Sequence, residues 1–239
     1  MIDTPEQRLS RLRDTCVDGA VVTAFDAEFA RLPGRAFVER VLRDRLGARV
    51  VVVGRNFRFG RKRRGDVRRL RALGRRSGID VVAVPPARLG GRVVSSSAVR
   101  GLLLAGRVEE AASLLGRPYE VVGRVVRGRG RGRLLGYPTA NLETPNELLP
   151  GGVFITETVR AGRALPSLTS VGASPTFGPQ PLAVETLILD FAGSLYGSGL
   201  TVRFLRKIRP TRKFRSAAAL AARIAEDIEE ARAFFRRPD

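Results

Sequence analysis

The chain has 239 residues, 44% hydrophobic and 28% charged, which is typical of a globular protein with room for one large or two modest domains. Its formal net charge of +20 favours anionic partners, although a GC-rich genome would enrich arginine without any function. Because the chain has no histidine, imidazole acid–base catalysis, histidine-ligated metals and serine or cysteine hydrolase triads are excluded.

Other features of the sequence limit the cellular compartment and the reaction classes that are possible. The single cysteine, Cys16, excludes an internal disulfide and indicates a reducing compartment. No apolar run approaches membrane-spanning length, and the first residues lack an apolar secretory core, so we expect a cytoplasmic protein without a membrane partner. The P-loop pattern GxxxxGK[ST] is absent, which excludes P-loop phosphoryl transfer.

The first part of the chain alternates expected helices with apolar strands. In chain order we expect a helix from residue 4, a buried strand over 20–24, a helix over 37–46, a strand over 49–53, a helix over 66–74 and a strand over 80–84. Alternation of this kind, with β-branched strands, predicts a parallel sheet covered by helices.

Three hydroxyl side chains, Ser95, Ser96 and Ser97, lie at the start of the next expected helix, over 98–104. A helix N-terminus offers unpaired N–H groups, so this segment can bind an anion; the alternative is that Ser96 or Ser97 merely caps the helix. A short helix over 108–115 is then broken by a Gly-Arg-Pro sequence, and we place a domain boundary there, between residues 1–116 and 117–239.

The second part of the chain is predicted to be a small antiparallel barrel. Short strands are expected over 119–126, 152–159, 168–172, 184–191 and 200–205, with Gly and Pro between them. A last helix, over 216–235, is expected to pack on the barrel through one apolar face that comprises Leu220, Ile224, Ile228, Ala231 and Phe235.

Residues 128–141 have the features of a phosphate-binding loop. Gly128, Gly130 and Gly132 alternate with arginines and precede a Gly-x-Pro-Thr-Ala-Asn turn. Glycine lets backbone N–H groups approach phosphate oxygens, arginine adds charge-assisted hydrogen bonds, and the Thr139 hydroxyl can ligate a hard cation. The loop therefore predicts a nucleotide-handling enzyme; the alternative is an Arg/Gly loop that contacts RNA or is simply solvated.

One carboxylate lies where an apolar side chain is expected. Glu185 shares a strand face with Leu187 and Leu189, and desolvation there would raise its pKa and make it a better general base. The alternative is a strand-edge acid paired with arginine. Other acids are interpreted as solvated or dipole-compensating charges: Asp190, Glu226, Asp227, Glu229 and Glu230.

Together these motifs resemble the bacterial bifunctional riboflavin kinase/FMN adenylyltransferase family, also called FAD synthetase. In the second half the resemblance rests, in order, on GRPYEVVGRVV, RGRGRLLGYPTANL, LLPGGVF, VGASPTFG, VETLILDF, SLYG and RFLRKIRPTRKF. In the first half it rests on VVVGRNFRFGRKRRGDV and VSSSAVRGLLLAGRVEEAASLLGRPY. The resemblance implies a truncated nucleotidyltransferase-like (Rossmann-like) parallel sheet over 1–116, then a six-stranded antiparallel flavokinase barrel with a C-terminal helix over 117–239.

For the second domain the resemblance implies a riboflavin kinase, which transfers the terminal phosphate of Mg-ATP to the ribityl hydroxyl of riboflavin and gives FMN. By position, Thr139 would ligate magnesium, Asn141 would support the metal and the phosphates, and Glu185 would be the base. Pro138 would fix the turn that presents Thr139. The segment 174–177 resembles the family's Asn-Pro-Thr-Phe but begins with Ser174.

For the first domain the resemblance implies flavin contacts at Asn56 and Phe59 and a triphosphate-binding element in Ser95-Ser96-Ser97 with Arg100. Family members normally begin with a strand and a Gly-x-His-x-Gly-His turn, which this sequence lacks. This departure argues against FMN adenylylation by the chain. Either the recorded start omits an N-terminal piece that completes a bifunctional enzyme, or the domain is a remnant that supports folding.

A rival reading from another class is a basic nucleic-acid-binding protein that uses the arginines. Its weakness is that the phenylalanines lie in or beside expected core strands or family motifs, where they do not form an exposed stacking ladder. We therefore expect riboflavin and ATP as the partners, with magnesium, and neither nucleic acid nor a membrane; the sequence leaves the oligomeric state open.

Overall fold

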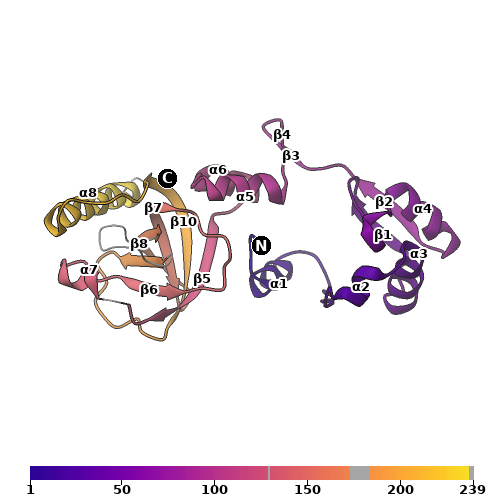
Figure 1. Ribbon diagram of the computed structural model, residues 1–239, viewed down its shortest axis with the longest axis horizontal. Helices are drawn as coiled ribbons and strands as arrows, with labels where there is room; N and C mark the ends of the chain where they lie inside the picture. Colours follow the sequence, from indigo (N-terminus) through magenta and orange to yellow (C-terminus); the bar gives the residue numbers. More distant parts are fainter. Residues whose placement is uncertain (129, 173–182, 237–239) are drawn as a thin grey trace. The chain divides into compact units, whose positions relative to one another are not determined.

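The computed structural model describes residues 1–128, 130–172 and 183–236, and the chain forms two compact units (Figure 1). One unit comprises Met1–Asp14 and Val94–Asp239, and the other comprises Thr15–Val93. The units divide the chain differently from the expected boundary at 116/117, because helices α5 (Ser96–Leu104) and α6 (Val108–Leu115) share a hydrophobic core with the barrel. The boundary at 116/117 stays a prediction.

The larger unit is built on a closed six-stranded barrel in which neighbouring strands run antiparallel, in the order β10-β5-β6-β9-β8-β7 (Figure 1). The strands are β5 (Tyr119–Val126), β6 (Ala140–Glu143), β7 (Gly152–Arg160), β8 (Arg163–Gly172), β9 (Ala183–Ile188) and β10 (Gly199–Arg209). The barrel confirms the predicted architecture. Strand β6 was not among the expected strands, because only four residues follow the Pro-Thr turn before the chain leaves the sheet.

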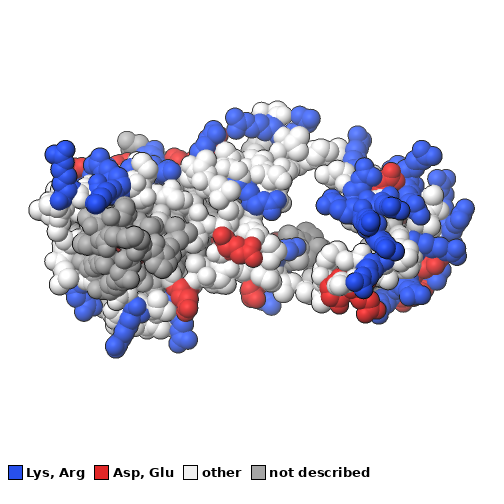
Figure 2. All heavy atoms as spheres, in the orientation of Figure 1, with Lys and Arg blue, Asp and Glu red and all other residues white. Residues whose placement is uncertain are grey.

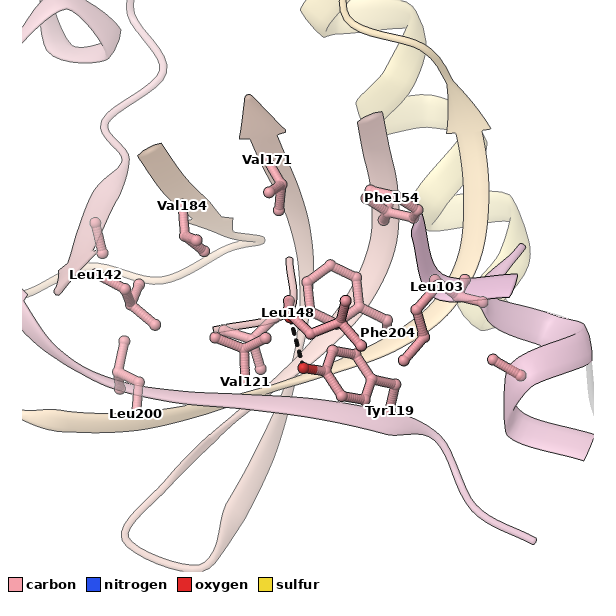
Figure 3. Packing of buried hydrophobic residues seen from close by; sticks show 14 of the residues in the cluster. Leu103, Tyr119, Val121, Leu142, Leu148, Phe154, Val171, Val184, Leu200 and Phe204 are labelled. Atoms are coloured by element: carbon pink, nitrogen blue, oxygen red, sulfur yellow. Dashed lines mark hydrogen bonds between the residues drawn. The ribbon is translucent and has the colours of Figure 1, made fainter. Parts of the chain in front are cut away.

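Alternation along the strands decides which side chains enter the barrel. Leu142 and Val184 point into its core, beside Val121 and Val171 (Figure 3). Tyr119 is fully buried, and its hydroxyl donates to the Leu148 carbonyl oxygen at 2.6 Å, which satisfies the polar end of an otherwise apolar side chain. Residues adjacent in sequence to these core positions face the outside of the barrel.

Helix α8 (Ala217–Arg236) packs on the outside of the barrel, as predicted. Ile228, Ala231 and Phe235 belong to one hydrophobic cluster with Ile155 and Leu168 of the barrel wall.

The interpretation of Asp227 as a solvated acid is wrong. Its side chain is only 2% exposed and accepts hydrogen bonds from Arg209 Nε and Nη2, the latter at 2.7 Å. The helix therefore docks through a buried ion pair as well as through apolar side chains.

Helix α1 (Pro5–Arg13) begins after the cap residue Thr4, as predicted, and is hydrogen-bonded to the barrel unit. Thr4 and Gln7 form a reciprocal capping box, with hydrogen bonds of 3.2 and 2.9 Å. Arg11 donates to the Glu120 carboxylate at 2.8 Å, and Asn146 donates to the Gln7 side chain at 2.9 Å. The first residues of the chain thus belong to the barrel unit. A short helix α7 (Arg131–Leu134) completes this unit.

The smaller unit contains a two-stranded parallel sheet of β1 (Val50–Gly54) and β2 (Asp80–Val84). Its other elements are α2 (Ala27–Arg31), α3 (Gly34–Ala36), the π-helical segment η1 (Phe37–Arg45), the 3-10 turn η2 (Arg61–Arg63), α4 (Val67–Arg76), β3 (Arg88–Leu89) and β4 (Arg92–Val93). The elements expected over 37–46, 49–53, 66–74 and 80–84 are therefore present.

The buried strand expected over 20–24 is wrong. These residues form neither helix nor strand, and Val21 and Val22 are each 74% exposed. An apolar run becomes a strand only where a neighbouring strand pairs with it, and among the described residues β1 and β2 pair only with each other.

Basic side chains are concentrated in the smaller unit. Thr15–Val93 contains 19 of the 43 Lys and Arg residues but only 7 of the 23 Asp and Glu residues. The face of this unit seen in Figure 2 is covered mostly by Lys and Arg. In the described part of the chain, no helix is both long and apolar enough to cross a membrane.

Candidate active site in the barrel unit

A cavity of about 550 Å³ lies at one end of the barrel. Its walls come from the start of β6, from β9 and from the segment that follows β9. The lining residues are Val125, Arg133, Pro138, Thr139, Ala140, Thr186, Leu187, Ile188, Asp190, Phe191, Ala192, Gly193, Ser194, Leu195 and Tyr196. The cavity is thus mostly apolar and aromatic, with a few polar side chains, as is usual for small-molecule sites.

Strand register brings the two halves of the predicted kinase site together. Asn141 on β6 is the direct partner of Glu185 on β9, and Ala140 is the partner of Thr186. Side chains of directly opposed residues have Cβ atoms about 5 Å apart. Thr139 immediately precedes β6 and lines the cavity. The sequence separates Thr139 and Glu185 widely, but the fold places their strands side by side.

Glu185 lies on the strand face that the two-residue period of a strand predicts. It faces outward with Leu187 and Leu189, which pack in the cluster beneath helix α8, and it is half-buried. The cavity wall includes its neighbours Thr186 and Leu187 but, among the described residues, not Glu185 itself. Glu185 therefore lies at the edge of the cavity, and its role as base stays a prediction.

The glycines of the Arg/Gly loop are required by close packing against this site. A Cβ atom on Gly128 would overlap the Asn141 amide, and one on Gly132 would overlap the Tyr137 carbonyl oxygen and lie 3.0 Å from Thr139 Oγ1. Gly130 has φ of 69°, the left-handed region that favours glycine. The loop and α7 thus lie directly against both motif side chains, whereas the expected approach to phosphate oxygens stays a prediction.

The segment after β9 supplies wall residues that sequence reasoning missed. Asp190 was interpreted as solvated; its side chain is 75% exposed and paired with Arg232 at 2.7 Å, while the residue also lines the cavity. Tyr196 lines the cavity too, and the Arg127 guanidinium lies 6.0 Å from its ring centroid. The sequence signal was Tyr196 itself, which lies in the SLYG motif.

The serine run caps a helix, but not through the expected residues. Ser95 is the cap of α5, and its Oγ accepts from the Ala98 backbone N–H at 3.2 Å, so the assignment to Ser96 or Ser97 is wrong. Ser96, Ser97 and Arg100 are exposed and do not line the barrel cavity. Their triphosphate-binding role stays a prediction.

The two expected flavin contacts lie in the smaller unit and differ in exposure. Asn56 is exposed, whereas Phe59 is only 5% exposed and stacks on Phe57 with ring centroids 5.9 Å apart. Gly65 packs against the Phe59 ring so closely that a Cβ there would overlap it. A second cavity, of about 430 Å³, has Phe59 in its wall. Packing therefore leaves little of this ring for a ligand. Ser174 and the rest of its motif lie outside the described residues.

Comparisons with known proteins match both parts of the chain. The family model described as riboflavin kinase matches residues 115–235, and that described as FAD synthetase matches residues 1–98. The bifunctional riboflavin kinase/FMN adenylyltransferase of Escherichia coli K12 is 36% identical over 98% of this chain and 77% of its own length. That of Pseudomonas fluorescens is 38% identical over 91% and 70%.

A solved structure has the same architecture. A protein from Streptococcus pneumoniae, described as a macrolide-efflux protein, superposes with a TM-score of 0.86 at 30% identity, over 97% of this chain and 75% of that chain. Since the FAD synthetase model matches residues 1–98, the sequence argument against FMN adenylylation finds no support in the comparisons.

Proposed function

Because the chain belongs to the bifunctional riboflavin kinase/FMN adenylyltransferase family, we propose that its barrel unit is a riboflavin kinase that converts riboflavin to FMN with Mg-ATP. One observation carries the proposal: Asn141 and Glu185 are directly opposed on β6 and β9, beside a cavity that Thr139 lines. We place this activity in the cytoplasm, in keeping with the free and exposed Cys16.

Glu185 acts on the nucleophile. It orients the ribityl hydroxyl and accepts its proton while the oxygen forms a bond to the terminal phosphorus of ATP. The bond from that phosphorus to the bridging oxygen breaks, and ADP leaves. Little covalent chemistry falls to the protein in such a transfer, so positioning supplies most of the rate.

Thr139 and Asn141 would hold the magnesium ion. A hydroxyl and an amide oxygen are hard ligands, and Mg²⁺ usually takes few protein ligands and completes its shell with phosphate oxygens and water. The ion, when bound, neutralises charge on the phosphates. Arg133 in the cavity wall adds a second positive charge, and the glycine loop holds Asn141 and Thr139 in place.

Replacing the carboxylate tests the assignment. We expect Glu185→Gln, which keeps the shape of the side chain, to lower kcat for FMN formation roughly 100- to 1000-fold, while the Kd for riboflavin changes less than about threefold. Glu143→Gln, which alters an exposed acid at the end of β6, is the matched control and should keep full activity. Full turnover by Glu185→Gln would disprove the role of this residue.

The FAD synthetase match favours a second activity, adenylylation of FMN. With no histidine available, charge on the transferred group would have to be stabilised by arginine or backbone N–H groups. FAD and pyrophosphate formed from FMN and ATP would establish this activity, and Glu185→Gln should leave it unchanged. If FMN accumulates without FAD, the chain is a kinase alone.

A further inference from the structure

A row of hydroxyl side chains crosses the barrel interior and has no part in the proposed chemistry so far. Its members are Thr156 and Thr158 on β7, Ser167 and Thr169 on β8, and Thr186 on β9, and each is at most 1% exposed. Thr186 is two residues from Val184 on the same strand and therefore shares its inward face (Figure 3). Thr186 alone of the five lines the cavity.

Four contacts join these hydroxyls to one another and a fifth runs to a backbone carbonyl oxygen, and five protons are available to make them. Ser167 Oγ donates to the Thr156 carbonyl oxygen at 2.9 Å, which uses its single proton, and Thr158 Oγ1 donates to Ser167 at 2.9 Å. The 2.8 Å contact between Thr156 Oγ1 and Ser167 Oγ must then use the proton of Thr156.

The same count of one proton per hydroxyl assigns the donor in the remaining two contacts. Because Thr156 has already donated, its 2.8 Å contact with Thr169 Oγ1 uses the proton of Thr169. Thr169 has then donated as well, so its 2.9 Å contact with Thr186 Oγ1 uses the proton of Thr186. This is the only arrangement in which all five contacts are hydrogen bonds, and in it the Thr186 proton points away from the cavity.

Toward the cavity, the Thr186 oxygen can consequently only accept. The surrounding wall suits a flat heteroaromatic ring, since it includes Val125, Ile188, Phe191 and Tyr196. A buried acceptor selects strongly for a ligand donor, because a ligand without one leaves the polar oxygen unpaired or forces the hydroxyl row to reorganise.

Building on the proposed kinase function, we infer that Thr186 is a specificity-determining residue that accepts a hydrogen bond from an N–H group on the ring of a bound substrate. Two substrates carry such a donor, ATP on its adenine amino group and riboflavin on N3 of the flavin. Thr169 is a positioning residue, because it takes the Thr186 proton and keeps Thr186 an acceptor.

Equilibrium binding to the full chain, with one substrate at a time, tests the inference without turnover. Two ligand pairs test the donor: ATP against purine riboside triphosphate, which lacks the amino group, and riboflavin against 3-methylriboflavin, in which a methyl group replaces the N3 hydrogen. For one pair, we expect the wild-type protein to bind the donor-bearing member about tenfold more tightly, and Thr186→Val to abolish this preference. The pair that responds identifies the substrate that contacts Thr186.

Two further variants separate selectivity from packing. Thr169→Val frees the Thr186 proton and should reduce the preference to less than about threefold, whereas Thr158→Val, at the far end of the row, should leave it near tenfold. Equal loss in Thr158→Val, or a preference that survives in Thr186→Val for both pairs, would overturn the inference. If the wild-type protein makes no FMN yet Thr186→Val removes the preference, the kinase proposal fails and the Thr186 assignment stands.

Discussion

Gly128 shows how one residue without a side chain fixes the position of another. The loop runs so close to β6 that a Cβ atom on Gly128 would overlap the Asn141 amide. The end of an Asn side chain is flexible, so Gly128→Ala should displace the amide and leave the fold intact. Since displacement of a positioning group by about 1 Å can reduce the rate about 100-fold, we expect a loss of that order in kcat/KM for FMN formation.

Gly151→Ala is the matched control, because a Cβ there meets nothing within 4 Å. It should retain activity. The double variant Gly128→Ala with Asn141→Ala should be no slower than Asn141→Ala alone, because both act on the same amide. Additive losses would show that Gly128 acts by another route.

For single residues, the sequence predicted on which face of a strand a side chain lies better than it predicted which residues that side chain contacts. A two-residue period was enough to place Glu185 with Leu187 and Leu189, because alternation is a local property of a strand. It could not show that Asn141 lies opposite Glu185, since register depends on residues far apart in the chain. For the same reason Asp227 was taken for a solvated acid: Arg209, the more deeply buried of its two arginine partners, lies on another element.

Helix α8 is attached to the barrel through a charge pair that is almost fully removed from water. Asp227 is 2% exposed and Arg209 12% exposed. Asp227→Ala would leave the guanidinium buried without its partner, so we expect the free energy of unfolding to fall by about 3 kcal/mol in urea titrations.

Glu229→Ala, on the same helix but 63% exposed, should change the free energy of unfolding by less than about 1 kcal/mol. A double variant, Asp227→Leu with Arg209→Met, should recover part of the loss, because it removes the buried pair together, while Arg223, which also contacts Asp227 at 3.0 Å, keeps its pairing with Glu226. Equal destabilisation by Asp227→Ala and Glu229→Ala would contradict the assigned burial.

Helix α1 contacts the barrel through the Glu120 carboxylate, which pairs with Arg11 of the helix and with Arg203 of β10. Burial alone would raise the pKa of Glu120, but hydrogen bonds from Arg203 and Arg11 outweigh it and hold the pKa below its ordinary value. A lowered pKa in the folded state contributes stability at neutral pH that is lost as pH falls through that folded pKa.

We therefore expect Glu120→Gln to lower the free energy of unfolding by about 1–2 kcal/mol at pH 7. The difference from wild type should shrink toward zero as pH falls through the lowered pKa of Glu120, because the wild-type carboxylate then becomes neutral as well. Denaturant titrations across this range measure it, with Glu230→Gln on the exposed face of α8 as the control. A difference that does not vary with pH would exclude a charge effect.

At the level of elements, the sequence predicted what depends on local pattern and failed where pairing decides. Long periodic segments such as α4 and α8, and the β-branched run of β1, formed as expected. Residues 20–24 have the same apolar character as β1 but pair with no strand of the described residues. Strand β6 has only four residues and was recognised as part of a motif, because its sheet partners β5 and β9 define it.

Arginine has two roles in the whole molecule: it forms ion pairs inside the barrel unit, and it makes the surface of the smaller unit basic. In the barrel unit, Arg11, Arg203 and Arg209 pair with buried or half-buried acids and hold elements together. In the smaller unit, basic residues greatly outnumber acids, and many of them lie on the face seen in Figure 2. The arginines in ion pairs add nothing to the net charge of +20, of which +12 lies on the smaller unit, and the net charge does not by itself indicate a nucleic-acid partner.

The two units should also differ in stability. The barrel unit has an extensive core that includes Tyr119, Phe154 and Phe204, whereas the core of the smaller unit has few fully buried side chains. One face of its two-stranded sheet leaves Val50 and Val52 more than half exposed, at 56% and 62%. Two-stranded sheets are only marginally stable in water. We therefore expect the smaller unit to open first.

Hydrogen exchange measures this directly, because amides of β1 and β2 should lose protection at a lower denaturant concentration than amides of β7 and β8. A substrate that binds only the barrel unit stabilises only that unit. Riboflavin at about 100 times its Kd should therefore add about 2.7 kcal/mol to the free energy of unfolding of the barrel unit and nothing to that of the smaller unit. A single transition that riboflavin shifts as a whole would show that the two cores fold as one cooperative body.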